Sequence, residues 1–277
     1  MEHVVIVGLG LIGGSLAKAF AAHTEDYVAG IDTDPAVIEA ALAEGAIAKE
    51  GTAEDLAHAD FVYLCLYPQA DLDFLKAHAP DIRKGAVVTD VCGIKGEICG
   101  KLAACAEQNG FFYCGSHPMA GTEKHGYFAS YADLFKGASY LLAPCGAPEE
   151  VVDRLRAKAF SLGFGRCVLT TPEEHDRMIA FTSQVPHALA CAYVLSPCCP
   201  KHRGFSAGSY RDVSRVANIN ETLWTELFLD NAGPLTAELD TLLENLSAIR
   251  NAIASGDRGG LCELLRRGRL IKEELGE

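Results

Sequence analysis

The sequence predicts an α/β protein, with a doubly wound, mostly parallel sheet followed by an all-α segment. Two observations lead to this fold class. Over residues 1–171, short apolar runs alternate with helical segments, which is the pattern of a parallel sheet. From Pro172 onward strand-like runs disappear and long helical stretches continue to Glu277. We therefore expect a sheet domain over residues 1–171 and a helical domain over residues 172–277, without a flexible linker.

The predicted strands are short apolar runs bounded by turn residues. They cover residues 3–7, 27–31, 61–66, 86–89, 111–114, 139–142 and 165–169, and residues 15–22 and 35–44 have helical patterns. The helical domain has a clear beginning at Thr171 and Pro172, where a capping hydroxyl precedes a proline and two acids. This start signal sets the predicted domain boundary.

Composition excludes several classes of protein. Of the 277 residues, 49% are hydrophobic, enough to form a sizeable core. The net charge of −13 argues against a nucleic-acid partner, and an anionic substrate would need a local cluster of Arg or Lys. No apolar run reaches membrane-spanning length, and the chain enters a strand at once. We expect a cytoplasmic protein without a membrane partner.

The eleven cysteines are scattered and include no CxxC pair. We expect reduced, mostly buried thiols in a reducing compartment. Cys198, Cys199 and His202 are the one hint of a zinc site, but their spacing is not that of common zinc ligands. Packing is the favoured interpretation, and we expect no metal.

A glycine motif, Gly8-Leu9-Gly10-Leu11-Ile12-Gly13, follows the first predicted strand and opens a helix. In this context the motif indicates a dinucleotide site. The first glycine permits a tight turn, Gly10 lets the backbone approach a pyrophosphate, and Gly13 allows close helix–strand packing. Asp32 ends the second strand, where an acid can bind ribose hydroxyls. Thr33 and Asp34 follow instead of a cation, which favours NAD over NADP.

Polar residues recur along the helix that begins at Pro172. Asp176, Ser183 and His187 are spaced by seven and four residues, so a regular helix places them within about 20° of one line. Pro186 should kink this helix and free a backbone carbonyl near His187. A solvated face is the alternative, but the neighbouring residues are apolar. We expect the stripe to face a cleft.

Arg211 and Arg215 lie one helical turn apart in the segment SYRDVSR. Asp212 could hold Arg215 in a salt-bridged surface helix. Alternatively, the guanidinium groups form a fork for a substrate carboxylate. Spacing alone does not decide between these interpretations.

The segment GSHPMAGTEKHGYFAS, residues 115–130, follows the predicted strand at 111–114. Position at the carboxyl edge of the sheet makes His117 a candidate working imidazole, because ligands of open α/β sheets bind there. His125 is interpreted as an ordinary loop histidine.

Together these segments resemble the prephenate/arogenate dehydrogenase family of tyrosine biosynthesis, from residue 4 to about residue 230. The resemblance is carried by GLGLIGGSLA, TDVCGIKGEI, GSHPMAGTEKHGYFA, TPEEHDRMIAFTSQVPHALA, and SYRDVSRVAN followed by Trp224. It implies a Rossmann domain with NAD as cofactor and an all-helical dimerisation domain, hence a homodimer. It also implies oxidative decarboxylation of a dianionic cyclohexadienyl substrate in a cleft between the domains.

The resemblance also implies residue roles. His117 matches the family's catalytic histidine, which hydrogen-bonds the ring hydroxyl, and His187 is a second catalytic candidate. Arg215 matches the arginine that binds a substrate carboxylate, and Lys95 closes a loop near the nicotinamide. The other expected substrate-binding residues are Glu123, Asp176, Ser183, Gln184 and Trp224.

Two positions depart from the family pattern. Gly93 stands where many members have a serine that assists at the hydroxyl, and Gln184 replaces the first histidine of the commoner SHLPH pattern. Prephenate and arogenate therefore both stay open as substrates. Two further alternatives are another two-domain NAD(P) hydroxyacid dehydrogenase or imino-acid reductase, and an inactive NAD-binding sensor or scaffold.

Overall fold

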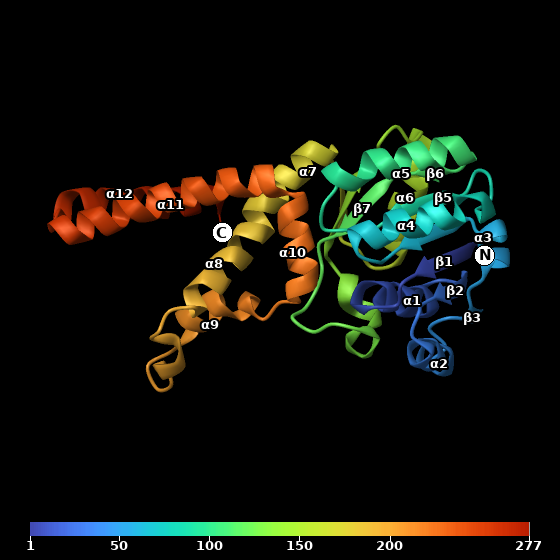
Figure 1. Ribbon diagram of the computed structural model, residues 1–277, viewed down its shortest axis with the longest axis horizontal. Coiled ribbons are helices and arrows are strands. Elements are labelled where there is room, and N and C mark those ends of the chain that lie inside the picture. Colours follow the sequence, from blue (N-terminus) through green and yellow to red (C-terminus); the bar gives the residue numbers. More distant parts are fainter. Residues whose placement is uncertain (277) are drawn as a thin grey trace. The chain divides into compact units, whose positions relative to one another are not determined.

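The computed structural model describes residues 1–276, and Figure 1 shows their course. The chain forms two compact units, Met1–Asn231 and a second that begins at Ala232. The domain boundary predicted at residue 171 lies inside the first unit and stays a prediction. No helix of the described residues is long and apolar enough to cross a membrane.

A six-stranded parallel sheet organises the first unit, with the strand order β3-β2-β1-β4-β5-β6. The strands are β1 (His3–Val7), β2 (Tyr27–Ile31), β3 (Lys49–Glu50), β4 (Phe61–Leu64), β5 (Val87–Asp90) and β6 (Phe112–Tyr113). Helices connect them: α1 (Leu11–His23), α2 (Pro35–Ala43), α3 (Ala53–His58), α4 (Pro68–His78), η1 (Ala79–Asp81) and α5 (Gly96–Asn109). The order reverses between β1 and β4, which is where sheets of this type bind ligands. The predicted doubly wound fold is confirmed.

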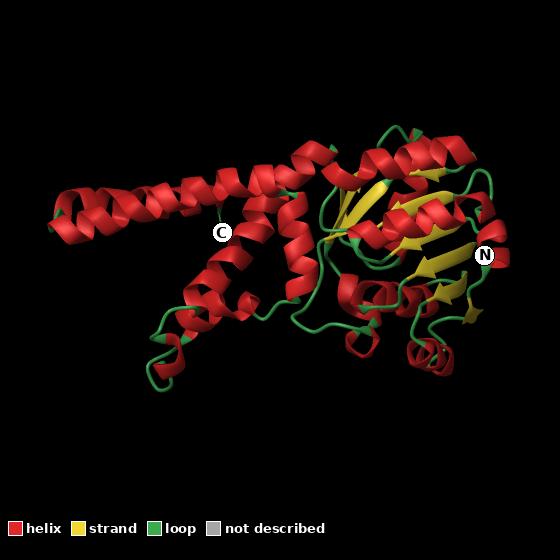
Figure 2. Cartoon of the chain, in the orientation of Figure 1, coloured by secondary structure: helices red, strands yellow, loops and turns green. Residues whose placement is uncertain are grey.

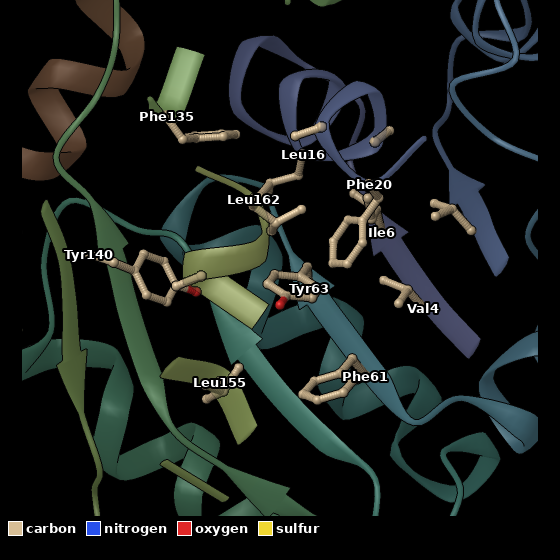
Figure 3. Packing of buried hydrophobic residues seen from close by; sticks show 14 of the residues in the cluster. Val4, Ile6, Leu16, Phe20, Phe61, Tyr63, Phe135, Tyr140, Leu155 and Leu162 are labelled. Carbon is tan, nitrogen blue, oxygen red and sulfur yellow. The ribbon is translucent and has the colours of Figure 1, made fainter. Parts of the chain in front are cut away.

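Each face of this sheet has its own hydrophobic core, because successive side chains of a strand point to opposite faces. Val4 and Ile6 of β1 join one core with residues of α1 and α2, together with α6 (Glu149–Ser161). Figure 3 shows this packing. Val5 and Val7 join the other core with residues of α3, α4 and α5. Burial of each such side chain contributes roughly 1.5–3 kcal/mol.

A second, three-stranded sheet contains β7 (Gly115–Pro118), β8 (Ser139–Ala143) and β9 (Arg166–Leu169). Strands β7 and β8 are antiparallel, and β8 and β9 are parallel. The expectation of one sheet is therefore wrong, because the run predicted at 139–142 pairs with β7 and the run predicted at 165–169 pairs with β8, and neither of them pairs with β6. Figure 2 shows the strands of both sheets.

His117 lies within a strand, and not in a loop as expected. It pairs with Leu141 in the register of β7 and β8. The sequence places His117 after the strand predicted at 111–114, whereas the backbone begins a new strand at Gly115. In fact a Cβ at Gly115 would stand 2.8 Å from Sγ of Cys99 on α5, so glycine lets β7 pass close to that helix.

The remainder of the first unit is mostly helical after Thr171. The elements are α7 (Pro172–Ile179), the π-helical turn η4 (Ala180–Gln184), α8 (Val185–Val194), η5 (Cys199–Lys201), α9 (Gly208–Ser214), η6 (Arg215–Ala217) and α10 (Glu221–Asp230). Short turns η2 (Tyr127–Ala129) and η3 (Ala132–Phe135) precede β8. The predicted helix start is confirmed, because Oγ1 of Thr171 accepts a hydrogen bond from the Glu174 amide. The second unit consists of α11 (Ala232–Ser255) and α12 (Arg258–Leu275).

Candidate active site

The glycine loop joins β1 to α1 at the point where the strand order reverses. Gly8 has φ +88° and its amide donates to the Ile31 carbonyl at 2.7 Å, a left-handed conformation that favours glycine. A Cβ at Gly13 would lie 1.8 Å from the Gly8 oxygen, so only glycine fits there. A Cβ at Gly10 would meet no atom within 4 Å. Because Gly10 has no side chain, the space beside the beginning of α1 is open.

The N-terminus of α1 is suited to bind a phosphate. Gly10 is its N-cap and supplies no side-chain hydrogen bond, and Leu11 and Ile12 are the first helical residues. Amides in this position attract anions, and the helix dipole adds to the attraction. The residues present therefore fit the pyrophosphate of a dinucleotide.

Asp32 supports the same loop from the end of β2. One of its carboxylate oxygens accepts from the Leu9 amide at 2.7 Å, and the other accepts from the Asp34 amide at 3.0 Å. Each oxygen keeps capacity for a further donor such as a ribose hydroxyl. Asp34 caps α2 by accepting from the Ala36 amide at 2.9 Å. No Lys or Arg follows β2 before Lys49, so no nearby cation in this segment offers a partner for a 2′-phosphate.

His117 belongs to a chain of three hydrogen-bonded side chains. Its Nδ1 lies 2.9 Å from Nε2 of His175, a residue 58 positions later in the sequence. Nδ1 of His175 lies 2.7 Å from Oδ1 of Asp176. Both His175 and Asp176 are buried on the first turns of α7. The arrangement connects a carboxylate, an orienting histidine and a terminal histidine in one line of hydrogen bonds.

The donors in this chain follow from the carboxylate. Asp176 accepts from two backbone amides, Lys95 at 2.8 Å and Gly96 at 2.6 Å, so it acts as an acceptor throughout. Nδ1 of His175 therefore carries its proton and donates to Asp176, which leaves Nε2 as the acceptor for Nδ1–H of His117. The Nε2 atom of His117 keeps its lone pair and has no hydrogen-bond partner among the described residues.

The surroundings of His117 favour its neutral form. Burial lowers its pKa well below the usual 6.5, and the neighbouring His175 and the charge of Lys95 lower the pKa further. Burial also lowers the pKa of His175. His117 is therefore a neutral imidazole near pH 7, with Nε2 ready to accept a proton.

Asp176 does not have the position expected of a substrate ligand. Its carboxylate is buried and bonded to the backbone at the beginning of α5 and to His175. A carboxylate at a helix N-terminus is stabilised by the free amides and by the helix dipole. These partners suit a carboxylate that positions His175, and the expected substrate contact of Asp176 stays a prediction.

Lys95 also differs from its expected role beside the nicotinamide. Its side chain is only 1% exposed, and the ammonium forms an ion pair with Asp90 at the end of β5. The same ammonium donates to the carbonyls of Cys92 at 3.0 Å and Ile94 at 3.3 Å. The donors of the Lys95 ammonium are therefore occupied by groups of its own loop and of β5, and its expected role beside the nicotinamide stays a prediction.

A second cluster contains Glu123, His187, Arg215 and Trp224. Arg215, in η6, forms an ion pair with Glu123, 92 residues earlier, and not with Asp212. His187 stacks on Trp224 with ring centroids 3.8 Å apart, and its Nδ1 donates to the Ser183 carbonyl at 2.7 Å. Burial lowers the pKa of His187, and the charge of Arg215 contributes. The structure thus brings four of the predicted site residues together.

The predicted polar stripe on one helix line is wrong. The turn Ala180–Gln184 is π-helical, so each residue there advances by less than 100° and the later residues rotate off the line. Asp176 consequently faces α5 while His187 faces Trp224. The carbonyl of Ser183 accepts a hydrogen bond from Nδ1 of His187, and the freeing of a carbonyl by Pro186 stays a prediction.

Gln184, an expected substrate ligand, has protein partners for both polar atoms of its side chain, and its substrate role stays a prediction. Its amide nitrogen donates to the Leu227 carbonyl at 2.9 Å, and its oxygen accepts from Asn231 at 2.7 Å. The side chain is 1% exposed. Both polar atoms therefore have protein partners, and they anchor the π-helical turn to the end of α10.

Gly93, one of the two positions that depart from the family pattern, is not held to glycine by its neighbours. A Cβ at Gly93 would meet Leu227 at an ordinary 3.5 Å, so no close contact demands glycine there.

The side chains of the zinc alternative have other partners. Sγ of Cys199 shares a hydrogen bond with the Tyr210 hydroxyl at 3.3 Å, and His202 stacks on the same ring. Residues 1–276 contain no group of three side chains arranged to hold a metal ion.

His175 is the functional residue that sequence reasoning missed. The helical spacing of Asp176, Ser183 and His187 points to Asp176 and not to its neighbour His175. Adjacent histidine and aspartate in a first helical turn are a usable signal, because the carboxylate can orient the imidazole. The partner of that imidazole, His117, is evident only from the folded chain.

A glycine loop at the strand reversal and an oriented neutral histidine define a nicotinamide-dinucleotide-dependent oxidoreductase. Residues 16–160 match the nucleotide-binding domain of prephenate dehydrogenase, and residues 171–267 match the dimerization domain of the same enzyme. The chain belongs to the prephenate dehydrogenase family, which confirms the resemblance found in the sequence.

Individual relatives agree with this assignment. The cyclohexadienyl dehydrogenase of Zymomonas mobilis is 32% identical over 273 residues, covering 95% of this chain and 92% of the relative. The crystal structure of A. aeolicus prephenate dehydrogenase with hydroxyphenyl propionate and NAD+ has a TM-score of 0.88 at 26% identity, covering 99% and 98% of the two chains. Synechocystis arogenate dehydrogenase has a TM-score of 0.81 at 27% identity, covering 98% and 99%.

Proposed function

We propose that this protein oxidises prephenate with loss of CO₂, giving 4-hydroxyphenylpyruvate in tyrosine biosynthesis, with NAD as the cofactor. The observation that carries the proposal is the unpartnered Nε2 of His117, whose neighbours make it a proton acceptor. NAD is favoured over NADP because Asp32 and Asp34 stand where a cation would be needed. Arogenate is the alternative substrate, since relatives named for either activity have this fold.

His117 would perform the proton transfer of this reaction. The nicotinamide ring, when bound, accepts a hydride from the carbinol carbon. Nε2 of His117 accepts the hydroxyl proton as that carbon becomes a ketone. The ring carboxylate para to the new ketone is then vinylogous to a β-keto acid, so CO₂ leaves and the ring becomes aromatic. His175 and Asp176 hold the imidazole in the required tautomer throughout.

Arg215 would bind a substrate carboxylate and orient the ring. Its guanidinium is paired with Glu123, whose pKa is lowered mainly by the hydrogen bond from Arg215. A carboxylate on the substrate is the same kind of partner, so it can replace Glu123. This exchange supplies the local positive site that an acidic protein needs for a dianionic substrate.

Replacing Arg215 by Ala is expected to raise KM for prephenate by about 10- to 100-fold, the loss of one charge-assisted interaction. Turnover at saturation should fall less, because Arg215 is not placed at the reacting hydroxyl. Steady-state kinetics with each substrate varied in turn make the measurement. An increase confined to the KM for NAD would contradict the carboxylate assignment. Arg211 is exposed and does not share the Glu123 ion pair of Arg215, so Arg211→Ala is the matched control and should leave turnover and KM for prephenate unchanged.

The pH profile follows from the state of His117. Its pKa is lowered from 6.5, so the active neutral form persists as pH falls through that value. We expect the acid limb of kcat/KM to have its midpoint below 6.5, with the rate lost at lower pH as Nε2 takes up a proton. Initial rates between about pH 5 and 8 measure the limb. A midpoint at or above 6.5 would contradict a buried neutral base.

The defining experiment compares substrates and cofactors. Purified protein is assayed for NADH or NADPH formation with prephenate and with arogenate, each with and without tyrosine. Faster turnover with prephenate and NAD supports the proposal. Faster turnover with arogenate would show that arogenate, and not prephenate, is the substrate. Tight NAD binding without turnover on either acid would support the alternative of an inactive sensor.

We also propose a homodimer formed through the C-terminal helices. The match of residues 171–267 to a dimerization domain supports this, as do apolar side chains exposed on α11 and α12, among them Leu243, Leu246, Ile253, Leu265 and Ile271. Sedimentation of the purified protein measures its mass, and a monomer would contradict the assignment.

A further inference from the structure

Two buried amide side chains join α7, the π-helical turn η4 and α10. Asn231 directly follows α10, and its side-chain nitrogen donates to the carbonyl of Asp176 at 2.9 Å and to the side-chain oxygen of Gln184 at 2.7 Å. Gln184 ends η4, and its own nitrogen donates to the Leu227 carbonyl of α10 at 2.9 Å. Only 2% of Asn231 and 1% of Gln184 are exposed. We call the side chains of Asn231 and Gln184 the amide bridge.

The amide bridge is bonded to the residue from which the hydrogen-bonded chain to His117 starts. Asn231 donates to the backbone carbonyl of Asp176, whose carboxylate accepts two amides at the beginning of α5 and bonds to His175. One residue is thus held on its side chain by α5 and on its backbone by the end of α10. A shift of α7 relative to α10 would therefore move this carboxylate, and with it the imidazole that contacts His117.

The amide bridge also lies where the helical segment with both site histidines changes its pitch. His175 precedes the π-helical turn, His187 follows it, and Gln184 is its last residue. π-helical turns are rare and occur frequently at functional sites. On the other side of the bridge, α10 carries Trp224, the ring on which His187 stacks. The bridge therefore connects the backbone that holds the His117 chain to the backbone that holds the second cluster.

We propose that Asn231 is a positioning residue, whose two N–H groups fix α7 against α10 and so set the place of His117 relative to the cluster that contains Arg215. This inference rests on the proposed function, because that function assigns the two clusters to opposite ends of one substrate. A misplacement of about 1 Å between reacting groups can lower a rate by about 100-fold. Two hydrogen bonds from one buried amide are suited to prevent such a shift.

Replacing Asn231 by Leu removes both donors and keeps a side chain of similar size. We expect turnover of the acid that the wild type oxidises to fall by about 10-fold or more, with its KM changing less. NAD affinity, measured by calorimetry, should stay unchanged, because the glycine loop is not bonded to the amide bridge. Full turnover in folded Asn231→Leu protein would overturn the proposal.

Asn109→Leu is the matched control for this variant. Asn109 is the last residue of α5, at the end of the helix away from Asp176, and its side chain donates to the Cys105 carbonyl of the same helix at 2.8 Å. The substitution is the same and also removes an amide that bonds to a carbonyl. Turnover and KM should both stay at the wild-type value in Asn109→Leu.

A double variant separates positioning from stability. In Asn231→Leu the oxygen of Gln184 is left without its donor, so the single variant should unfold at a lower temperature. Adding Gln184→Leu replaces the unpaired amide by an apolar contact, which should recover part of that stability. We expect turnover to stay low in the double variant, because neither leucine donates to the Asp176 carbonyl. Recovery of turnover together with stability would overturn the positioning role.

A measurement without substrate distinguishes this proposal from the proposed function. The imidazole proton that His175 donates to Asp176 is buried, and its NMR resonance is identified by its absence in His175→Phe. We expect this resonance to shift in Asn231→Leu and to stay in place in Asn109→Leu. An unchanged resonance in folded Asn231→Leu protein would overturn the positioning role. A shifted resonance in a protein that oxidises neither acid would support the positioning of His175 and contradict only the proposed function.

Discussion

Replacing His117 by Asn should lower turnover by about 100-fold or more while leaving NAD binding unchanged. The reason is local to one atom. Nε2 of His117 carries the lone pair that has no partner in the hydrogen-bonded chain, and the shorter side chain of Asn has no atom at the position of Nε2. We expect cofactor binding to depend instead on Gly10, where an added Cβ would meet no atom within 4 Å, and on the beginning of α1. Steady-state kinetics with prephenate and calorimetric titration with NAD measure the two quantities.

A nearby histidine provides the control for this variant. His125 lies on the same segment, is exposed, and has no assigned role, so His125→Asn should retain full turnover. Thermal unfolding of both variants separates lost chemistry from lost structure. Unchanged turnover in folded His117→Asn protein would remove His117 from the mechanism.

Replacing His175 by Phe should have the second largest effect, a loss of turnover of about 10- to 100-fold. Phenylalanine fills a similar volume but cannot accept the Nδ1–H of His117. His117 would then lose the partner that selects its tautomer, and a buried N–H would be left without an acceptor, at a cost of about 1–3 kcal/mol. Because His175 acts through His117, KM for prephenate should change less than turnover.

His175→Gln tests whether the acceptor itself is what matters. The amide oxygen of glutamine reaches the region of the imidazole Nε2, so this variant should recover part of the activity lost in His175→Phe. The pH profile gives an independent reading, because the acid limb of kcat/KM should shift when the neighbour of His117 changes. Equal activity in the two variants would show that His175 merely fills space.

Family membership joins these expectations to a known class of chemistry. The match to prephenate dehydrogenase covers residues 16–160 with its nucleotide-binding domain and residues 171–267 with its dimerization domain. The residue roles proposed here still rest on geometry, above all on the Asp176–His175–His117 chain and on the Glu123–Arg215 ion pair. The variants above examine those two arrangements separately.

Much of the framework is predictable from local sequence. The glycine motif after a strand, the acid at the end of β2 and the start of α7 each depend on residues within a few positions of one another. Backbone geometry explains this, since a Cβ at Gly13 would contact Gly8 only five residues away. The alternation of apolar runs and helical segments likewise predicted the doubly wound sheet.

The errors occur where a residue has a plausible local role and a stronger distant partner. Asp176 fits a polar stripe by spacing, yet the amides that begin α5, 80 and 81 residues earlier, bind its carboxylate. Lys95 ends a cofactor-side loop, yet Asp90 draws its ammonium into the interior. Gln184 is expected to bind substrate because of its position in a motif, yet its amide nitrogen donates a hydrogen bond to the Leu227 carbonyl of α10. Buried polar groups must find partners, and the fold decides which ones are within reach.

By itself the sequence determined the order of strands and helices, the dinucleotide loop and the candidate His117, because these depend on short-range sterics, capping and the period of apolar residues. Only the tertiary structure decided that His117 lies in a strand, that His175 and Asp176 form a hydrogen-bonded chain with it, and that Arg215 forms an ion pair with Glu123. Each of these contacts joins residues from different elements, except the neighbouring pair His175 and Asp176. Their geometry exists only after the two sheets and α7 have packed together.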